Sequence, residues 1–283
     1  MKRAIQSILY GFCIILFLTE PLNASVQITN GQAAPMGQFP WNAEIMLQDT
    51  AVIPENLGGC GGALIAPQWI LTAGHCATNY MPGFMPQVVI GAANLSSEDQ
   101  YEVIPVDKIF IHPGFTKYKY NKIMGNLAYD FALLHLTSPS KKSPITLINP
   151  DSKAVDPDHQ ATVMGWGNTG SGLSGQLMYV DIPIDRAIDC ENLYQYNDEQ
   201  WFNNHIMICA GNTSGARYNA ARGDSGGPLV VEENNNFYLV GVVSWGDPND
   251  PAFQLAHPVV YARVSTVENW LLNTVSTYDE TQL

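Results

Sequence analysis

Hydrophobic and polar positions of this chain alternate over short distances and rarely follow a helical period. From residue 41 onward, short apolar or alternating runs such as 62–65, 69–72 and 88–90 are bounded by Gly, Pro and Asn. Such runs are typical of β-strands joined by turns. Further strands are expected at residues 101–104, 108–111, 131–136, 161–166, 177–184, 206–210, 229–231, 237–245 and 259–264. This pattern predicts an all-β barrel or sandwich.

One helical pattern stands at the C-terminal end. Ser265 or Thr266 can cap a helix, and the apolar residues that follow share one face: Val267, Trp270, Leu271 and Val275. We expect a helix over about 265–276, packed on the second half of the protein, and a tail over 277–283.

The N-terminal segment has the build of a secretory signal. Lys2 and Arg3 precede an apolar run over residues 8–18, which is short for a membrane span. The sequence therefore predicts a signal peptide over residues 1–24, cut after Ala24. An uncleaved membrane anchor is the alternative that the length disfavours. The mature protein is expected to be secreted, extracellular and free of membranes.

The number of cysteines and the net charge indicate the compartment of the protein and exclude some classes of partner. Cys13 leaves with the signal, and the remaining cysteines are even in number, as an oxidising compartment favours: Cys60, Cys76, Cys190 and Cys209. Sequence alone permits three pairings. No C-x-x-C pair occurs, so no cysteine metal site is expected. No required metal is predicted. The formal net charge of −13 makes nucleic acid and anionic membranes poor partners. Asn94 and Asn212 open glycosylation sequons.

Three motifs carry the candidate chemistry. His75 lies in the segment LTAGHC, Asp130 opens DFALL, and Ser225 lies in GDSGGP. A serine hydroxyl is a weak nucleophile, so it needs a base and a group that orients the base. The three motifs supply one residue of each kind.

These motifs, in this order, resemble those of the trypsin/chymotrypsin-like serine peptidases, and the resemblance runs from about residue 28 to 270. It implies two six-stranded antiparallel β-barrels, about 28–145 and 146–264, with the active site between them and a peptidase domain over 28–276. It also implies the disulfides Cys60–Cys76 and Cys190–Cys209.

The resemblance further implies a residue for each role in peptide hydrolysis. Ser225 would attack the peptide carbonyl, His75 would move the proton and Asp130 would orient His75. The amides of Gly223 and Ser225 would form the oxyanion hole. The expected protein is a monomeric secreted serine endopeptidase without cofactors, which acts on proteins or peptides and meets protein protease inhibitors.

The segment beginning at Ile28 resembles the mature N-terminus of this family. In the family the freed isoleucine amine pairs with the aspartate before the catalytic serine, here Asp224. Residues 25–27 would then form a short activation segment of an inactive precursor. Gln27 stands where the family commonly has Arg or Lys. An activating protease of different specificity, or another form of trimming, is therefore expected.

The specificity pocket departs from that of trypsin-like members. Asn219 stands where they have an aspartate that binds a substrate Arg or Lys, so an uncharged side chain of small or medium size is expected. The other residues expected to contact substrate are Ser244, Trp245, Gly246 and Val259. The cysteine pair common at the pocket wall is absent. Residues 115–127 are expected to form a surface loop beside Asp130.

A binding protein that keeps the protease fold without turnover is the alternative. Such proteins generally lose one of the three chemical residues, and this chain keeps all three. Only the missing pocket cysteines and the unusual Gln27 junction favour it.

Overall fold

We analysed a computed structural model of the chain. It describes residues 28, 31–47, 59–78, 85–97, 101–120, 123–167, 175–196, 198–211, 220, 223–247 and 257–281. The predicted signal peptide, the activation segment, Asn212 and Asn219 lie outside the described residues.

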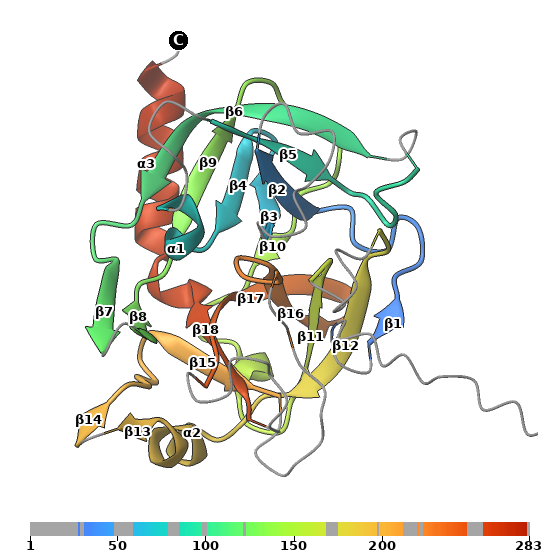
Figure 1. The fold of residues 1–283 in the computed structure, drawn as a ribbon. Coiled ribbons are helices and arrows are strands. Elements are labelled where there is room, and N and C mark those ends of the chain that lie inside the picture. Colours follow the sequence, from blue (N-terminus) through green and yellow to red (C-terminus); the bar gives the residue numbers. More distant parts are fainter. Residues whose placement is uncertain are drawn as a thin grey trace, which may run out of the picture.

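The N-terminal half forms a closed barrel, in which each strand pairs with the next in the order β2-β3-β4-β9-β6-β5 (Figure 1). Its strands are β2 (Asn42–Leu47), β3 (Cys60–Ala66), β4 (Trp69–Thr72), β5 (Pro86–Ile90), β6 (Glu102–Ile111) and β9 (Ala132–Leu136). The strands predicted at 101–104 and 108–111 are one strand, β6, with an irregular register between Val106 and Lys108.

The C-terminal half is built around a second antiparallel sheet, in the order β12-β11-β16-β17-β18-β15. A bridge between Ile184 and Ala210 joins the two edges of this sheet. Its strands are β11 (Gln160–Gly165), β12 (Met178–Pro183), β15 (Met207–Ala210), β16 (Pro228–Glu233), β17 (Asn236–Trp245) and β18 (Val259–Arg263). The predicted all-β fold of two barrels is confirmed.

Short elements complete the fold. Two strands extend the second sheet: β1 (Gln32–Ala33) beside β12, and β10 (Thr146–Leu147) parallel to β17. The segment expected as a loop beside Asp130 instead holds the hairpin of β7 (Thr116–Tyr120) and β8 (Ile123–Ala128). The remaining elements are α1 (Gly74–Ala77), η2 (Lys153–Val155), α2 (Ala187–Leu193), β13 (Gln195–Tyr196), β14 (Glu199–Gln200), η3 (Val264–Thr266) and α3 (Glu268–Thr281). Among the helices of the described residues, none is long and apolar enough to cross a membrane.

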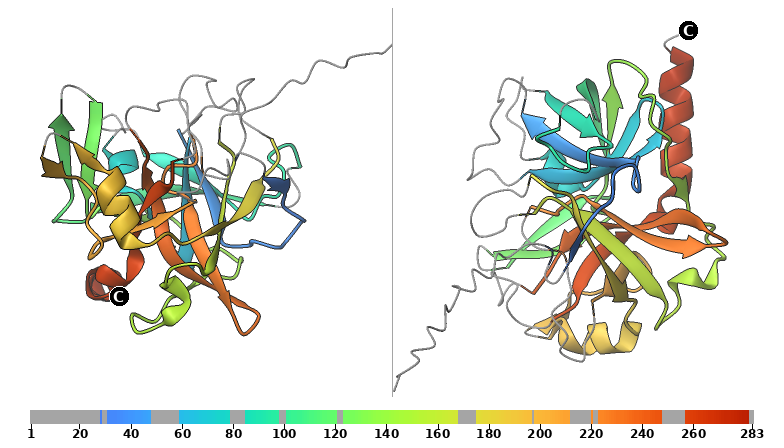
Figure 2. Two further views of the ribbon diagram at one scale, coloured as in Figure 1. Left: turned by 90° about the horizontal axis from the view of Figure 1, so that it is seen from below. Right: turned by 90° about the vertical axis from the view of Figure 1, so that its right-hand side faces the viewer.

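The C-terminal helix α3 differs from the prediction in its bounds and its packing. It begins at Glu268 and continues to Thr281, into the predicted tail. The helix rises along the outside of the first barrel (Figures 1 and 2). Tyr278 packs edge to face on Trp69 of β4 with ring centroids 5.5 Å apart, and the Trp69 indole donates to Asp279 at 3.3 Å. The expectation that α3 packs on the second barrel was wrong.

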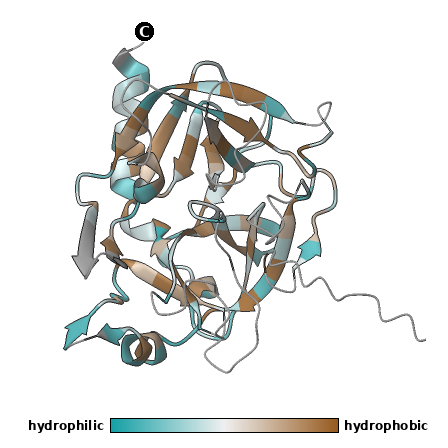
Figure 3. Cartoon of the chain, in the orientation of Figure 1, coloured by the Kyte–Doolittle hydropathy of each residue, from teal (hydrophilic) through white to brown (hydrophobic). Residues whose placement is uncertain are grey.

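One apolar cluster fills the first barrel and continues into the second half, where it includes Trp166 and Val242, and another cluster lies within the second barrel. Apolar residues follow the strands of both sheets (Figure 3). Both disulfides pair as the resemblance implied: Cys60 with Cys76, and Cys190 with Cys209, with Cα atoms 6.2 Å and 6.5 Å apart. Cys60–Cys76 fixes α1 to the start of β3, and Cys190–Cys209 fixes α2 to β15. The disulfides therefore tie both short helices to their barrels.

Two adjacent leucines test the placement of α3. Leu271 is 1% exposed, whereas Leu272 is 58% exposed. We expect Leu271→Ala to lower the free energy of unfolding by about 2–5 kcal/mol, because it leaves a cavity against the barrels. Leu272→Ala should change it by about 0.5 kcal/mol or less. Denaturant unfolding of both variants measures the difference, and equal losses would contradict this helix orientation.

Candidate active site

His75 and Asp130 come together because their strands are neighbours in the first barrel. His75 lies on α1, directly after β4, and Asp130 lies just before β9. Thr72 at the end of β4 pairs with Ala132 at the start of β9. Both side chains therefore lie at the same end of the barrel, and both are buried.

The Asp130 carboxylate holds His75 by two contacts. Oδ1 accepts the backbone amide of His75 at 2.7 Å, and Oδ2 lies 2.7 Å from His75 Nδ1. Because the carboxylate is an acceptor, it places a proton on Nδ1 and leaves Nε2 of a neutral ring as an acceptor. The ring is thus held in the tautomer that can remove a proton from a nucleophile.

A third contact to Asp130 comes from the second barrel. The Ser244 hydroxyl donates to Asp130 Oδ2 at 2.6 Å. Ser244 lies at a register irregularity of β17, where Val243 pairs with Tyr261 but Trp245 pairs with Val260. A bulge of this kind redirects a side chain out of the regular alternation. The bulge aims Ser244 across the junction of the barrels.

Ser225 lies in a glycine-rich turn directly before β16. Gly223 and Gly226 have φ values of +99° and +81°, a backbone region that favours glycine. A side chain at position 226 would also meet the Thr72 hydroxyl, since its Cβ would lie 2.3 Å from Oγ1. The turn is fastened to the first barrel, because the Gly61 amide donates to the Ser225 carbonyl at 2.8 Å.

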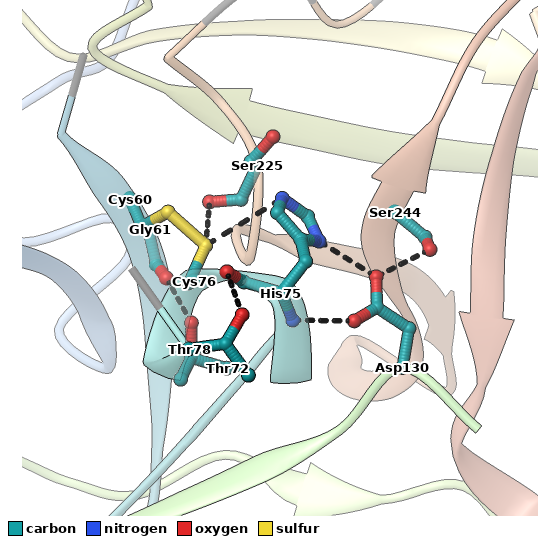
Figure 4. Close-up of a disulfide and its surroundings, with 9 residues drawn as sticks. All are labelled: Cys60, Gly61, Thr72, His75, Cys76, Thr78, Asp130, Ser225 and Ser244. Carbon is teal, nitrogen blue, oxygen red and sulfur yellow. Dashed lines mark hydrogen bonds and ion pairs between the residues drawn. A yellow bond between two sulfur atoms is a disulfide. The ribbon is translucent and has the colours of Figure 1, made fainter. Parts of the chain in front are cut away.

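Figure 4 shows Ser225 beside the His75 ring, on the side of Nε2 and away from Asp130. Within the described residues the structure gives no hydrogen bond between the Ser225 hydroxyl and His75. Such bonds are often long in unliganded sites and shorten when substrate binds. Within the described part of the chain, no hydrogen bond is given from the amides of Gly223 and Ser225.

Asp224 directly precedes Ser225 in the chain. It is fully buried, and its Oδ1 accepts the amide of Gly167 at 2.8 Å. Ile28 is 1% exposed and belongs to the apolar cluster of the second barrel. Burial, followed by the negative charge of Asp224, raises the pKa of Tyr261 well above its usual value. Asp224 is therefore a charge buried in the second half of the protein.

The residues expected to contact substrate are placed only in part. Trp245 is buried and packs edge to face on Tyr194, with ring centroids 4.9 Å apart. Gly246 follows it at the end of β17. Val259 is buried on β18 within the apolar cluster of the second barrel. Asn219 lies outside the described residues, so the predicted charge preference stays a prediction.

Sequence reasoning missed an ion pair beside this region. Asp247 Oδ2 lies 2.5 Å from His257 Nδ1, and the Asp247 side chain is buried. The pair joins two residues ten positions apart, directly after β17 and before β18. The sequence offered no signal for it, because neither residue stands in a motif.

Sequence reasoning also missed a buried carboxyl group, Glu44 on β2. Its pKa is raised well above the usual value, chiefly by burial and then by the negative charge of Asp224. An acidic residue between Ala43 and Ile45 was the available signal, but alternation alone places such a residue on either face of a strand.

Among the described residues, two groups of side chains are close enough to share a metal ion: Cys60, His75 and Cys76, and Asp185, Cys190 and Cys209. The cysteines of both groups form disulfides, so none offers the thiolate that binds a metal. Asn94 is half-buried, and its Oδ1 accepts the amide of Ser96 at 2.8 Å. Its glycosylation stays a prediction.

Comparison with known proteins assigns most of the chain to one family. A family model described as Trypsin matches residues 28–271. The chain is similar to "Serine proteinase stubble" of Drosophila melanogaster, with 31% identity over 93% of this chain, although it spans only 32% of that protein's length. It is also similar to a protein named "Trypsin" from Saccharopolyspora erythraea, with 30% identity over 88% of this chain and 98% of the relative. The chain belongs to the trypsin family of serine proteases.

Proposed function

We propose that this protein is a secreted serine endopeptidase made as an inactive precursor. The observation that carries the proposal is the hydrogen-bonded chain from Ser244 through Asp130 to His75, with Ser225 on the Nε2 side of the ring. Family membership supports a peptidase, and this geometry supports the roles of the individual residues.

In the proposed reaction the Ser225 hydroxyl attacks the peptide carbonyl while His75 Nε2 takes its proton. The charged imidazole is stabilised by Asp130, which the Ser244 hydroxyl and the His75 amide hold in place. The amides of Gly223 and Ser225 would bind the oxyanion, where one donor is worth roughly 3 kcal/mol. His75 then protonates the leaving amine, and water hydrolyses the acyl group on Ser225 by the reverse steps.

Activation would follow from cleavage before Ile28. The new ammonium group would pair with Asp224, a buried carboxylate whose Oδ1 also accepts the Gly167 amide. Ile28 packs in the apolar cluster of the second barrel, which is where its amine would lie after cleavage. The pairing would fix the turn that carries Gly223 and Ser225. The leader over residues 1–24 supports secretion, and the segment 25–27 would be removed by an activating protease.

The function is tested with protein that begins at Ile28 and a diverse peptide mixture, with cut sites mapped by mass spectrometry. We expect cleavage that Ser225→Ala abolishes, because that variant keeps the fold and loses the nucleophile. Cleavage of equal rate in Ser225→Ala would contradict the proposal. No cleavage by a folded protein with a free Ile28 amine would favour the binding-protein alternative.

The same mapping tests the pocket. We expect cuts after small or medium uncharged side chains, because the amide of Asn219 offers no full charge to a buried cation. Asn219→Asp should raise cleavage after Arg and Lys about tenfold or more, since it supplies the missing charge. Arg and Lys before most cuts of the unaltered protein would overturn this assignment.

Ser244→Ala tests the support of Asp130. We expect kcat to fall roughly tenfold with little change in KM. The lost hydrogen bond holds the Asp130 carboxylate, which stabilises the positive charge that His75 acquires in the transition state and not in the substrate complex. Thr162→Val is the matched control, since the Thr162 hydroxyl also donates to an aspartate at 2.6 Å, but on the exposed face of β11. Steady-state kinetics decide the point, and equal effects in both variants would contradict the role of Ser244.

A further inference from the structure

Glu44 is a buried acid that the proposed reaction does not use. It lies on β2, where it pairs with Gly61 of β3 and Val89 of β5, and it is 1% exposed. Its Oε1 occupies the space that a side chain at Gly59 would fill, 1.8 Å from the Cβ position there. Within the described residues, neither carboxyl oxygen has a hydrogen-bond partner.

A carboxylate without partners in such a place is costly, so burial favours the protonated form of Glu44. Burial is the larger cause of its raised pKa, and the negative charge of Asp224 adds to it. The two acids belong to different barrels. The field of one therefore acts on the other across the junction.

The strands packed on β2 supply no other charge. β3 (CGGALIA), β5 (PQVVI) and β11 (QATVMG) contain no charged residue, and Cys60 is held in its disulfide. The Asp224 turn reaches this region, because the Gly61 backbone approaches that of Gly227, with Gly227 Cα 2.7 Å from the Cβ position at Gly61. Among the described residues, Asp224 is thus the charged group that faces Glu44.

We infer that Glu44 is a positioning residue of the activation step, whose proton is coupled to the pairing of Asp224 with the new Ile28 ammonium. The inference rests on the proposed function. An ammonium beside Asp224 offsets the negative charge that adds to the effect of burial on Glu44. The ammonium pairs with Asp224, which keeps its charge, and the protonated fraction of Glu44 falls, with the proton released to solvent. By reciprocity, loss of the Glu44 proton strengthens the ammonium pair.

The coupling has a definite direction with pH. In the precursor the pKa of Glu44 is higher in the folded state than in the unfolded state, so the folded state binds more protons. The free energy of unfolding therefore falls as pH rises from the unfolded-state pKa to the folded-state pKa. In the cleaved protein the ammonium lowers the folded-state pKa of Glu44, so this loss of stability with rising pH is smaller. The stability gained on cleavage should therefore grow with pH.

The experiment compares melting temperatures of the precursor and of protein beginning at Ile28 between pH 5 and pH 8, in the unaltered chain and in Glu44→Gln. We expect the gap between the two forms to widen with pH in the unaltered chain, by about 3–5 °C for each unit by which the ammonium lowers the Glu44 pKa. In Glu44→Gln the gap between the two melting temperatures should lack this contribution, because glutamine has no proton to release.

Two further variants keep the test decisive. Glu44→Asp retains a carboxyl group at this position, so its gap should widen with pH as in the unaltered chain. This variant also tests the inference where Glu44→Gln folds poorly. Glu232→Gln makes the same change at an exposed position of β16 and should behave as the unaltered chain. Gaps that change equally with pH in the unaltered chain and in both Glu44 variants would overturn the inference.

The readout does not depend on peptide cleavage, so the two failures are distinguishable. An inactive protein whose gap still widens through Glu44 would contradict the proposed function alone. An active protein whose gap is unaffected by Glu44 would contradict this inference alone.

Discussion

The buried charge of Asp130 is the constraint on which the arrangement of the two barrels depends. A carboxylate removed from water must be matched by hydrogen bonds, and Asp130 receives them from both halves of the protein. Two come from the backbone and ring of His75 in the first barrel, and one comes from Ser244 in the second. A shift of one barrel against the other would break a contact of 2.6 Å and leave the charge incompletely paired. The hydrogen bonds to Asp130 thus fix the position of His75 relative to the Ser225 turn.

Three of the buried acids have different hydrogen-bond partners in the described part of the chain. Asp130 accepts hydrogen bonds from His75 and Ser244, Asp224 accepts the Gly167 amide among its interactions, and neither carboxyl oxygen of Glu44 has a hydrogen-bond partner there. These differences agree with the proposed roles. Asp130 would work at every turnover, Asp224 would receive its ammonium once, and Glu44 would answer only through its proton.

Much of this could be predicted from sequence, because the information was local. The motifs around His75, Asp130 and Ser225 each fix a short stretch of backbone, and their order fixes the fold that brings them together. The alternating runs predicted most strands of the two barrels, but β2 and the two-residue strands were not among them. Pro105 and the polar residues beside it divided β6 in the prediction. Tyr and Lys in residues 116–120 indicated a loop, although the alternation of these residues also suits the hairpin that forms.

What sequence could not predict depended on contacts between distant segments. The apolar stripe of α3 predicts a buried face, but not that Tyr278 would meet Trp69 on the first barrel. Glu44 required knowledge of which face of β2 is covered, and the Asp247–His257 pair required the course of the chain between them. In each case the deciding partner lies on another element.

The most direct test of the account is whether Ser225 becomes acylated through His75. Protein beginning at Ile28 would be mixed with an activated ester of a small uncharged amino acid and quenched in acid, and the acyl group would be located by peptide mapping. The account predicts one acyl group on Ser225, and its loss in His75→Ala under the same conditions. An acyl group at another residue, or equal labelling of Ser225 in His75→Ala, would contradict it.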